Sequence, residues 1–250
     1  MALARPRWTG TGAFTLTEFR VQLHEGLAIV TSMIVQVVLL IFVDILDRPI
    51  LPYALIGAVV YSLFMLGQRV QNEAAYIRID HKLTELYHAS PLTAEGYFVG
   101  MSAGVLLAYL PPILVLVVAM ELIAPLGPLA SATLLGAGAA VWLFTSSMGY
   151  VFSTLFKENR AIWPYASILT NLFGVLPPVF YPIRFLPGYW HPIALAIPTS
   201  SAAALVEAAQ GGLVSLSGGE LLFGAIVLAI EAIAVFVFAV YWARRSARER

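Results

Sequence analysis

Long apolar stretches, each close to the length that crosses a bilayer, constrain this chain more than any other feature. A helical span needs about 20 apolar residues for a hydrocarbon core of about 30 Å. Membrane strands would instead alternate over about 10 residues, so continuous stretches leave helices as the spanning structure. The composition agrees, with 60% hydrophobic and 11% charged residues. We expect an all-α integral membrane protein with six transmembrane helices, at Gly26–Phe42, Pro52–Leu66, Tyr97–Leu122, Leu129–Phe152, Ile162–Phe180 and Leu221–Trp242.

One domain accounts for residues 1–250, because no internal repeat or low-complexity linker divides the sequence. Two proline pairs, Pro111–Pro112 and Pro177–Pro178, lie inside expected spans. Proline can kink a helix there without ending the span. The shortest expected span is the second, Pro52–Leu66.

Basic residues set the expected orientation, because cytoplasmic loops of membrane proteins accumulate Lys and Arg. With both termini in the cytoplasm and six spans, twelve basic residues lie inside and two outside. This bias predicts a multi-pass protein of the cytoplasmic membrane with an even number of spans. The inside set is Arg5, Arg7, Arg20, Arg69, Arg78, Lys82, Lys157, Arg160, Arg244, Arg245, Arg248 and Arg250, and the outside pair is Arg48 and Arg184.

The segment 12–25, ahead of the first span, has the pattern of an amphipathic interface helix. Phe19 and Leu23 fall on one side of it, and Arg20 is one of the polar residues beside them. Such a helix lies in the membrane surface with its apolar face in lipid. The same pattern also suits a lever that touches a cytoplasmic partner, and the residues leave both interpretations open.

A charged insert, residues 68–95, separates the second and third spans and holds seven of the 28 formally charged residues. Apolar residues at helical spacing predict a short cytoplasmic helix, which Ser90–Pro91 ends because proline disfavours helical dihedrals in the residue before it. Thr93 is suited to cap the next helix. The pattern fits either a helix that docks on another protein or an ordinary solvated loop helix. The residues expected to couple to a partner are Ile79, Asp80, Leu83, Glu85, Leu86, Ser90 and Pro91.

The chain after the fifth span, residues 176–201, is rich in both proline and aromatic residues. Its six prolines exclude one continuous helix, yet the segment is too apolar for a free loop. Short helices that dip into the outer leaflet and turn back satisfy both facts, if other helices shield the broken backbone. We therefore expect an external re-entrant segment at 181–205.

Polar residues within the spans are few. A carboxylate at mid-membrane costs about 2.5–3.5 kcal/mol on insertion scales, so Glu231 should face protein or water. Gln36 and Asn171 are weaker cases, and each of the three suits a helix contact as well as a transport pathway. The four histidines lack a shared ligand spacing and cysteine is absent, so we expect no metal site.

The order of these segments resembles the permease subunits of ABC-2-type exporters. Leu83-Thr84-Glu85-Leu86 followed by Ser90-Pro91-Leu92 is similar to the family's cytoplasmic coupling helix, although Lys82-Leu83-Thr84 replaces the common Gly-Thr-Leu. The match after span five is closer and follows the family's spacing of aromatic-proline, leucine-proline and proline-threonine elements. Its residues are Tyr181, Pro182, Leu186, Pro187, Pro198 and Thr199.

The resemblance implies a half-transporter that exports a hydrophobic or amphipathic compound such as a drug, lipid or glycan-like molecule. Two permeases, either two copies or this chain with a related one, would form the pathway in membrane lipid. Two separate nucleotide-binding ATPase subunits would dock on the coupling helices and bind the ATP and Mg. This chain would then bind no cofactor and no nucleic acid, and would not itself be an enzyme.

Leu216-Ser217-Gly218-Gly219-Glu220 looks like the signature loop of an ABC ATPase, but the chain lacks a Gly-x-x-x-x-Gly-Lys-Ser/Thr phosphate loop. The expected topology also puts this stretch outside, so we interpret it as a glycine turn at the start of the last span.

Two other classes of function compete with the exporter. An intramembrane enzyme needs a nucleophile with histidine or clustered carboxylates at one depth, and no expected span carries histidine or two carboxylates. An ATP-independent carrier or channel would show polar rings or paired broken helices in internal repeats, which are scarce here. Both alternatives predict function without an ATPase partner.

Overall fold

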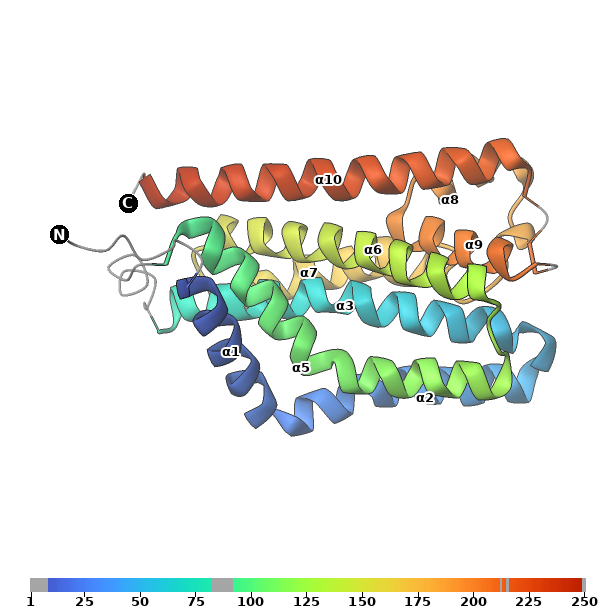
Figure 1. Ribbon diagram of the computed structural model, residues 1–250, viewed down its shortest axis with the longest axis horizontal. Helices are drawn as coiled ribbons and strands as arrows, with labels where there is room; N and C mark the ends of the chain where they lie inside the picture. Colours follow the sequence, from blue (N-terminus) through green and yellow to red (C-terminus); the bar gives the residue numbers. More distant parts are fainter. Residues whose placement is uncertain (1–8, 82–91, 212, 215, 249–250) are drawn as a thin grey trace.

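Long helices that run side by side make up most of the described chain. The computed structural model describes residues 9–81, 92–211, 213–214 and 216–248, and these form helices and turns without a strand (Figure 1). Five helices in this part of the chain are long and apolar enough to cross a membrane: Ile29–Leu46, Arg48–Ile79, Ala94–Ile123, Pro128–Leu155 and Gly218–Ser246. The protein is therefore all-helical and of the multi-pass membrane class, as its sequence predicts.

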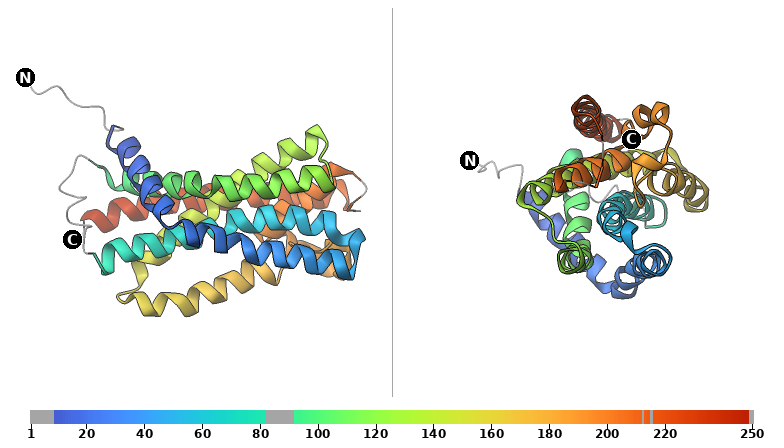
Figure 2. Two further views of the ribbon diagram at one scale, coloured as in Figure 1. Left: turned by 90° about the horizontal axis from the view of Figure 1, so that it is seen from below. Right: turned by 90° about the vertical axis from the view of Figure 1, so that its right-hand side faces the viewer.

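The third helix forms the centre of the bundle. α1 (Thr9–His24) leads into α2 (Gly26–Leu46), and the short turn η1 (Arg48–Ile50) reverses the chain into α3 (Leu51–Ile79). Within the spanning windows, α3 is 72% buried, whereas α2 is 13% and α10 (Gly218–Arg248) is 17% buried. The end-on view in Figure 2 accordingly places α2 and α10 at the margins.

α3 is longer than the sequence predicts. We expected a span ending at Leu66 and a separate charged segment from residue 68, whereas the helix continues unbroken to Ile79. Its polar side chains find partners on later helices: Gln68 Nε2 donates to the carbonyl of Ala166 at 3.1 Å, and Arg78 donates to the carbonyls of Ser153 and Phe156. Because these partners satisfy the polar groups, the first part of the insert remains inside the bundle.

The next two helices match their predictions more closely. Thr93 Oγ1 accepts a hydrogen bond from the Gly96 amide at 3.0 Å and caps α5 (Ala94–Ile123), which confirms the predicted cap. The proline pair Pro111–Pro112 lies inside α5, which bends along its length without ending (Figure 1). α6 (Pro128–Leu155) then follows after a short connection.

The predicted fifth span, Ile162–Phe180, is replaced by a shorter and broken element. After η2 (Asn159–Ala161), α7 (Ile162–Thr170) runs into the π-helix η3 (Asn171–Val175), where the Leu176 amide donates to the Asn171 carbonyl at 2.8 Å. Pro177 and Pro178 follow directly and cannot donate the next helical hydrogen bonds. This element is not among the five long apolar helices.

Short helices complete the chain between that element and α10. They are η4 (Ile183–Phe185), η5 (Gly188–Trp190), α8 (His191–Leu195) and α9 (Pro198–Gln210). Gly188–Leu195 and Pro198–Gln210 together are long and apolar enough for one more crossing, but they meet at an angle of 111°. Six straight spans are therefore not observed: five helices are long enough, and this bent pair is the sixth apolar unit.

The backbones of α3 and α6 touch at glycine. A Cβ atom placed on Gly149 would lie 2.0 Å from the Gly67 carbonyl oxygen, and one on Gly67 would lie 2.3 Å from the Thr145 carbonyl oxygen. Membrane helices commonly use small residues in this way, because close packing drives their association in lipid.

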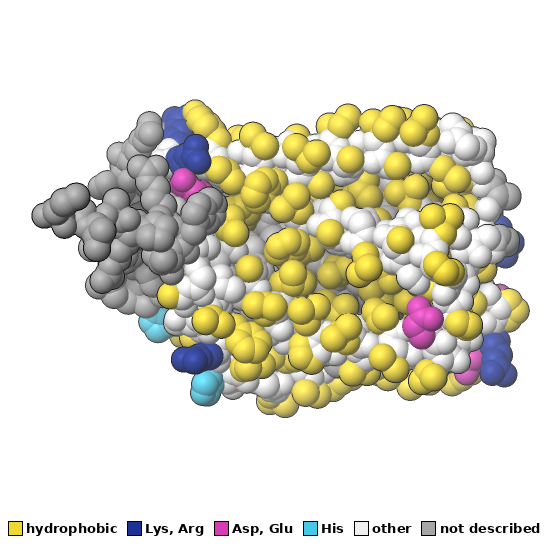
Figure 3. Space-filling view, in the orientation of Figure 1, with side chains coloured by type: hydrophobic (Ala, Val, Ile, Leu, Met, Phe, Trp, Pro, Cys, Tyr) yellow, Lys and Arg dark blue, Asp and Glu magenta, His cyan; other side chains and the backbone are white. Residues whose placement is uncertain are grey.

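The outer surface is apolar along its middle. In Figure 3, hydrophobic side chains cover the middle of the visible face, and Lys and Arg lie near its two ends. Helical spacing marks the outward row of α10, whose large exposed residues include Leu222, Ile226, Ile230, Ile233, Val237 and Tyr241. Such a surface is what contact with hydrocarbon requires.

Candidate functional site

One end of the bundle gathers most of the elements predicted to face the cytoplasm. α1 packs on the first part of α5, and the last turns of α3 and α10 lie at the same end (Figure 1). Arg244 on α10 forms an ion pair with Glu95 at the start of α5, with 3.2 Å between Nη2 and Oε1. Trp242 Nε1 also donates to Thr154 Oγ1 on α6 at 2.8 Å. We call this the charged end.

The predicted coupling residues are only partly described. Ile79 is the last residue of α3 and is half-buried, and Asp80 caps the helix at an exposed position. Leu83, Glu85, Leu86, Ser90 and Pro91 lie outside the described residues. Arg78 anchors the end of α3 to the end of α6, and Thr93 caps the start of α5. The helix ends on both sides of residues 82–91 are therefore held in place.

α1 is present as predicted, and the named interface residues are not the ones that pack most deeply on the protein. Arg20 and Leu23 are exposed and Phe19 is half-buried, so these residues lie on the outer side or at its edge. The buried residues are Thr11, Phe14, Glu18 and Gln22. The apolar residues therefore remain available to lipid, and the polar side of the helix is the one that contacts protein.

A row of glycines on α5 provides the seat for α1. A Cβ on Gly96 would lie 2.5 Å from Thr11 Oγ1, and one on Gly104 would lie 2.6 Å from Glu18 Cβ. Gly100, between them, would meet Phe14 at 2.9 Å. The spacing of four residues puts these glycines on one face of α5. This signal was available in the sequence, and it was missed.

An amide bridges two carboxyl groups where α1 meets α3. Gln22 Nε2 donates to Glu18 Oε1 at 2.9 Å and to Glu73 Oε2 at 3.0 Å. Burial raises the pKa of Glu18 to about 7, the neighbouring Glu73 adds to the rise, the hydrogen bond from Gln22 opposes it, and Glu25 adds a smaller rise. Neither carboxyl group was predicted to be a site residue.

The docking of α1 should therefore weaken as pH rises. The folded pKa of Glu18 lies above its ordinary value of 4.5, so its contribution is fully present below pH 4.5 and is lost as pH rises through about 7. The total loss is on the order of 3 kcal/mol. Because the chain has no cysteine, a cysteine introduced by Thr11→Cys reports docking through its alkylation rate. We expect faster alkylation at pH 8 than at pH 5.5, after correction for thiol ionisation.

Glu18→Gln is the matched control, because an amide keeps the acceptor for Gln22 and does not titrate. In that background the corrected alkylation rate should depend much less on pH. A pH dependence of equal size in both backgrounds would assign the effect to another group.

The opposite end of the bundle holds the predicted external motif. Tyr181 and Leu186 are half-buried, Pro187 is exposed, and Pro182, Pro198 and Thr199 are buried. The Tyr181 hydroxyl donates to the carbonyl of Leu176 at 3.1 Å, and the Thr199 hydroxyl donates to the carbonyl of Phe173. Two motif residues, Tyr181 and Thr199, thus tie the broken segment to the backbone of η3 and the residue after it.

α9 is fixed to several long helices. Ser201 Oγ donates to the Gly224 carbonyl on α10 at 2.9 Å. Gln210, at the other end of α9, accepts from the Gly127 amide at 3.0 Å and donates to the Pro125 carbonyl at 2.8 Å. α9 therefore spans from inside the bundle to the level where α6 begins.

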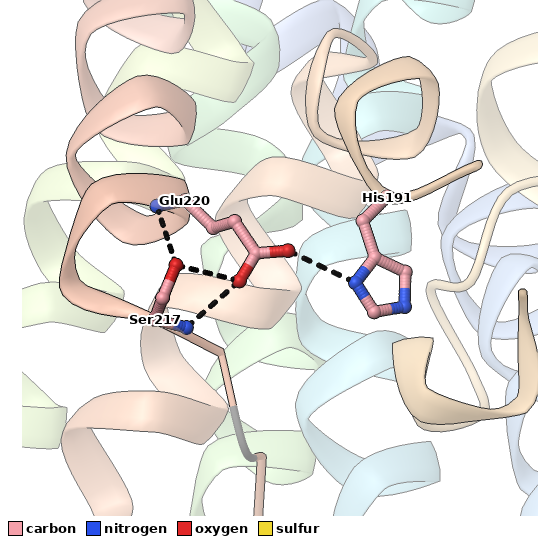
Figure 4. Close-up of polar contacts among 3 residues, drawn as sticks. All are labelled: His191, Ser217 and Glu220. Carbon is pink, nitrogen blue, oxygen red and sulfur yellow. Dashed lines mark hydrogen bonds and ion pairs between the residues drawn. The ribbon is translucent and has the colours of Figure 1, made fainter. Parts of the chain in front are cut away.

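Ser217 and Glu220 form a capping box at the start of α10. Glu220 Oε2 accepts from the amide and hydroxyl of Ser217, each at 2.8 Å, and Ser217 Oγ accepts from the Glu220 amide at 3.2 Å (Figure 4). His191 Nδ1 lies 3.1 Å from Glu220 Oε1 and ties α8 to the same point. This confirms that Ser217 serves the start of the last long helix.

The three polar residues predicted for a pathway do not meet at one place. Gln36 is buried and donates through Nε2 to Ser62 Oγ at 3.3 Å, whereas Asn171 is exposed at the start of η3. Glu231 is half-buried on α10, and its Oε2 has no hydrogen-bond partner among the described residues. Sequence reasoning missed Glu207 on α9, which is 1% exposed and has an unpartnered Oε1 in the described structure.

The described residues contain no group of three or more metal-ligating side chains that could hold a metal ion. Comparisons with family models, with curated proteins and with solved structures find no match to this chain. The functional inference therefore rests on the sequence and on the geometry of the two ends.

Proposed function

We propose that the chain is the permease subunit of an ATP-driven ABC-2-type exporter in the cytoplasmic membrane. The observation that carries this proposal is the arrangement at the charged end. α1, the exit of α3, the capped start of α5 and the end of α10 surround the two attachment points of the segment 82–91. A nucleotide-binding subunit that docks there would contact the segment that resembles the family's coupling helix.

The tethered attachment points suit the transfer of force. Arg78 links the exit of α3 to α6, and the ion pair between Glu95 and Arg244 links the start of α5 to α10. A push on the segment between them would therefore move long helices and not merely bend a loop. The ATP and Mg would be bound by the partner.

The opposite end fits the external re-entrant segment that the resemblance implies. His191, at the start of α8, contacts Glu220 at the start of α10, and Gln210, at the end of α9, contacts the connection before α6. Both ends of the bent pair thus lie near the starts of long helices that share one end of the bundle (Figure 1). A segment that enters and leaves at the same end does not cross the membrane. The chain would then cross six times, with α7 and η3 together as a broken fifth crossing. An even number of crossings is compatible with both termini in the cytoplasm.

The test begins with the tagged chain, purified from its native membrane in mild detergent with whatever binds it. We expect a stoichiometric nucleotide-binding subunit and ATPase activity. If residue 85 lies in the helix that the sequence predicts, Glu85→Pro should lower bound subunit or coupled ATPase activity at least tenfold, because proline costs about 3 kcal/mol inside a helix. Glu85→Ala is compatible with the helix that the sequence predicts there, so it separates loss of the side chain from disruption of the backbone. Both variants should elute from gel filtration like the wild type.

An intact preparation with neither a partner nor ATPase activity would contradict the proposal. The second candidate would then be an ATP-independent carrier, and a specific observation favours it over an enzyme. Glu207 is buried in the external half, and Glu231 has an unpartnered carboxylate oxygen among the described residues. Shielded carboxylates within a membrane protein often mark ion or proton routes. Transport driven by a proton gradient without ATP would identify that class.

A further inference from the structure

A cavity lies between α2, α3 and α5, at the place where the proline pair bends α5. Its volume is about 220 Å³, and Pro112 is part of its wall. Pro111 and Pro112 cannot donate backbone hydrogen bonds, and a bend at such a pair moves a helix away from its neighbours. Thr31, which is exposed on α2, also belongs to the wall, so the cavity reaches the outer surface of the bundle.

Much of the wall is apolar and suits a hydrocarbon group. Its apolar residues include Met65, Leu66, Pro112, Ile113 and Leu116. An engineered cavity of about 150 Å³ with a wall of this kind stays free of water and takes up benzene. The cavity between α2, α3 and α5 is larger, so a short hydrocarbon body has room in it.

Two polar atoms in this wall lack partners although they are deeply buried. Gln36 is 5% exposed and Tyr109 is 4% exposed, and both side chains line the cavity. Gln36 Oε1 and the Tyr109 hydroxyl have no hydrogen-bond partner among the described residues. An unsatisfied buried polar group costs about 1–3 kcal/mol, so these atoms point to an occupant that makes hydrogen bonds.

The orientation of the Gln36 amide follows from its neighbours on α3. The Ser62 hydroxyl donates to the Ala58 carbonyl at 2.7 Å, so its oxygen is left to accept a hydrogen bond. Gln36 Nε2 supplies that hydrogen bond at 3.3 Å. The amide oxygen of Gln36 is therefore the atom without a partner, and it can only accept.

These two atoms together select a hydroxyl group. Gln36 Oε1 needs a donor from the occupant, and the Tyr109 hydroxyl can donate to an acceptor on it. A hydroxyl group has one donor and two acceptor lone pairs, so it can serve both atoms. An ionised carboxylate or phosphate has no donor for Gln36 Oε1.

The charges around the cavity exclude an ionic occupant. Arg69 is on the wall, but it is already engaged: its guanidinium carbon lies 5.3 Å from the centre of the Tyr109 ring, and its charge acts on the Glu73 carboxylate. The positive charge of Arg69 opposes a second cation. An unpaired charge of either sign is also costly to bury among apolar side chains. The occupant is therefore neutral.

We propose that this cavity binds a neutral alcohol with a hydrocarbon body. Its hydroxyl group lies at Gln36 and Tyr109, and its hydrocarbon packs against Leu66, Ile113 and Leu116. The site lies within one copy of the chain, so it goes beyond the exporter proposal and needs no ATPase partner. Ordered water can also hydrogen-bond to the two polar atoms, and the experiment distinguishes water from an alcohol.

The experiment uses the full chain in nanodiscs of zwitterionic lipid and 1-octanol that carries a photoreactive diazirine. We expect saturable labelling, mapped by mass spectrometry to the α3 and α5 walls of the cavity. At equal concentration in the membrane, unlabelled 1-octanol should compete at least fivefold better than octane, because one net hydrogen bond contributes about 1 kcal/mol. Octanoate should compete as weakly as octane. These comparisons need no variant, so they remain decisive if substitutions impair folding.

Tyr109→Phe tests the hydroxyl site itself. It removes one oxygen atom that has no partner in the described structure and keeps the ring beside Arg69, so the Tm should not fall. The concentration that half-saturates labelling should rise about fivefold, for the loss of one hydrogen bond. Tyr241→Phe is the matched control, because Tyr241 is exposed on the outer surface of α10, and it should label like the wild type.

Three results would overturn the proposal. Labelling that does not saturate, or equal competition by octane and 1-octanol, would mean that partition into lipid alone places the probe. Labelling that avoids the cavity wall would leave water as the occupant. Wild-type affinity in a folded Tyr109→Phe protein would remove Tyr109 from the site. None of these results bears on the nucleotide-binding subunit, which is measured separately by co-purification.

Discussion

Gly149→Val should unfold or severely destabilise the bundle. The new Cβ would lie 2.0 Å from the Gly67 carbonyl oxygen and 2.9 Å from the carbonyl carbon, and these are backbone atoms that no side-chain rotation can move. α3 and α6 must therefore separate along the tightest part of their contact. Overpacking of a core costs about 1–3 kcal/mol and occasionally more, so we expect a fall in Tm of roughly 2–12 °C or loss of the folded fraction.

Gly136→Val is the matched control, because it makes the same substitution on the same helix at an exposed position with no atom within 4 Å of the new Cβ. Thermal unfolding of both proteins in one mild detergent, followed by gel filtration, measures the difference. If the two variants had equal Tm values, the α3–α6 contact would not hold the bundle together as the structure indicates.

The sequence predicts the apolar helices well because a single physical requirement governs them. Each of the five long helices contains the whole of a predicted span. The cap at Thr93 and the proline pair inside α5 could also be named in advance. Each of these features depends on residues that are neighbours along the chain. Local chemistry therefore suffices to find them.

The errors occur where distant residues satisfy polar groups. The end of α3 was placed at Leu66 because the polar residues after it suggest a loop. In the structure, Gln68 and Arg78 donate to carbonyls that lie 98 and 75 residues further along the chain. The sequence gives no sign of these pairings, so hydropathy alone ends the helix too early.

The apolar face of α1 was expected in lipid, and the exposed Leu23 agrees with this. What the sequence did not predict is which residues pack on the protein. Glu18 can be buried because Gln22 donates a hydrogen bond to it and the glycine row of α5 leaves room for α1. That row was visible in the sequence at positions 96, 100 and 104. Glu207 carried no such signal, since it lies within an alanine-rich helix without a matching basic residue nearby in sequence.

Gly104→Leu should release α1 from α5 while the rest of the bundle stays folded. A Cβ at this position would lie 2.6 Å from Glu18 Cβ, 2.8 Å from Glu18 Cγ and 2.9 Å from the Thr15 carbonyl oxygen, all of which belong to α1. Overpacking of about 1–3 kcal/mol corresponds to roughly a 5- to 150-fold shift toward the undocked helix. The alkylation rate of a cysteine introduced by Thr11→Cys should rise by that factor.

The release of α1 would also change the pH response, because Glu18 is buried only while the helix is docked. In the Gly104→Leu background, alkylation should therefore be fast at both pH 5.5 and pH 8. Gly12→Leu serves as the control, since a Cβ on Gly12 meets no atom within 4 Å. Protection of position 11 that survives Gly104→Leu would mean that contacts other than the glycine row hold α1. Fast alkylation at both pH values, with an unchanged Tm for the bundle, would establish α1 as a separately docked helix whose attachment Glu18 makes sensitive to pH.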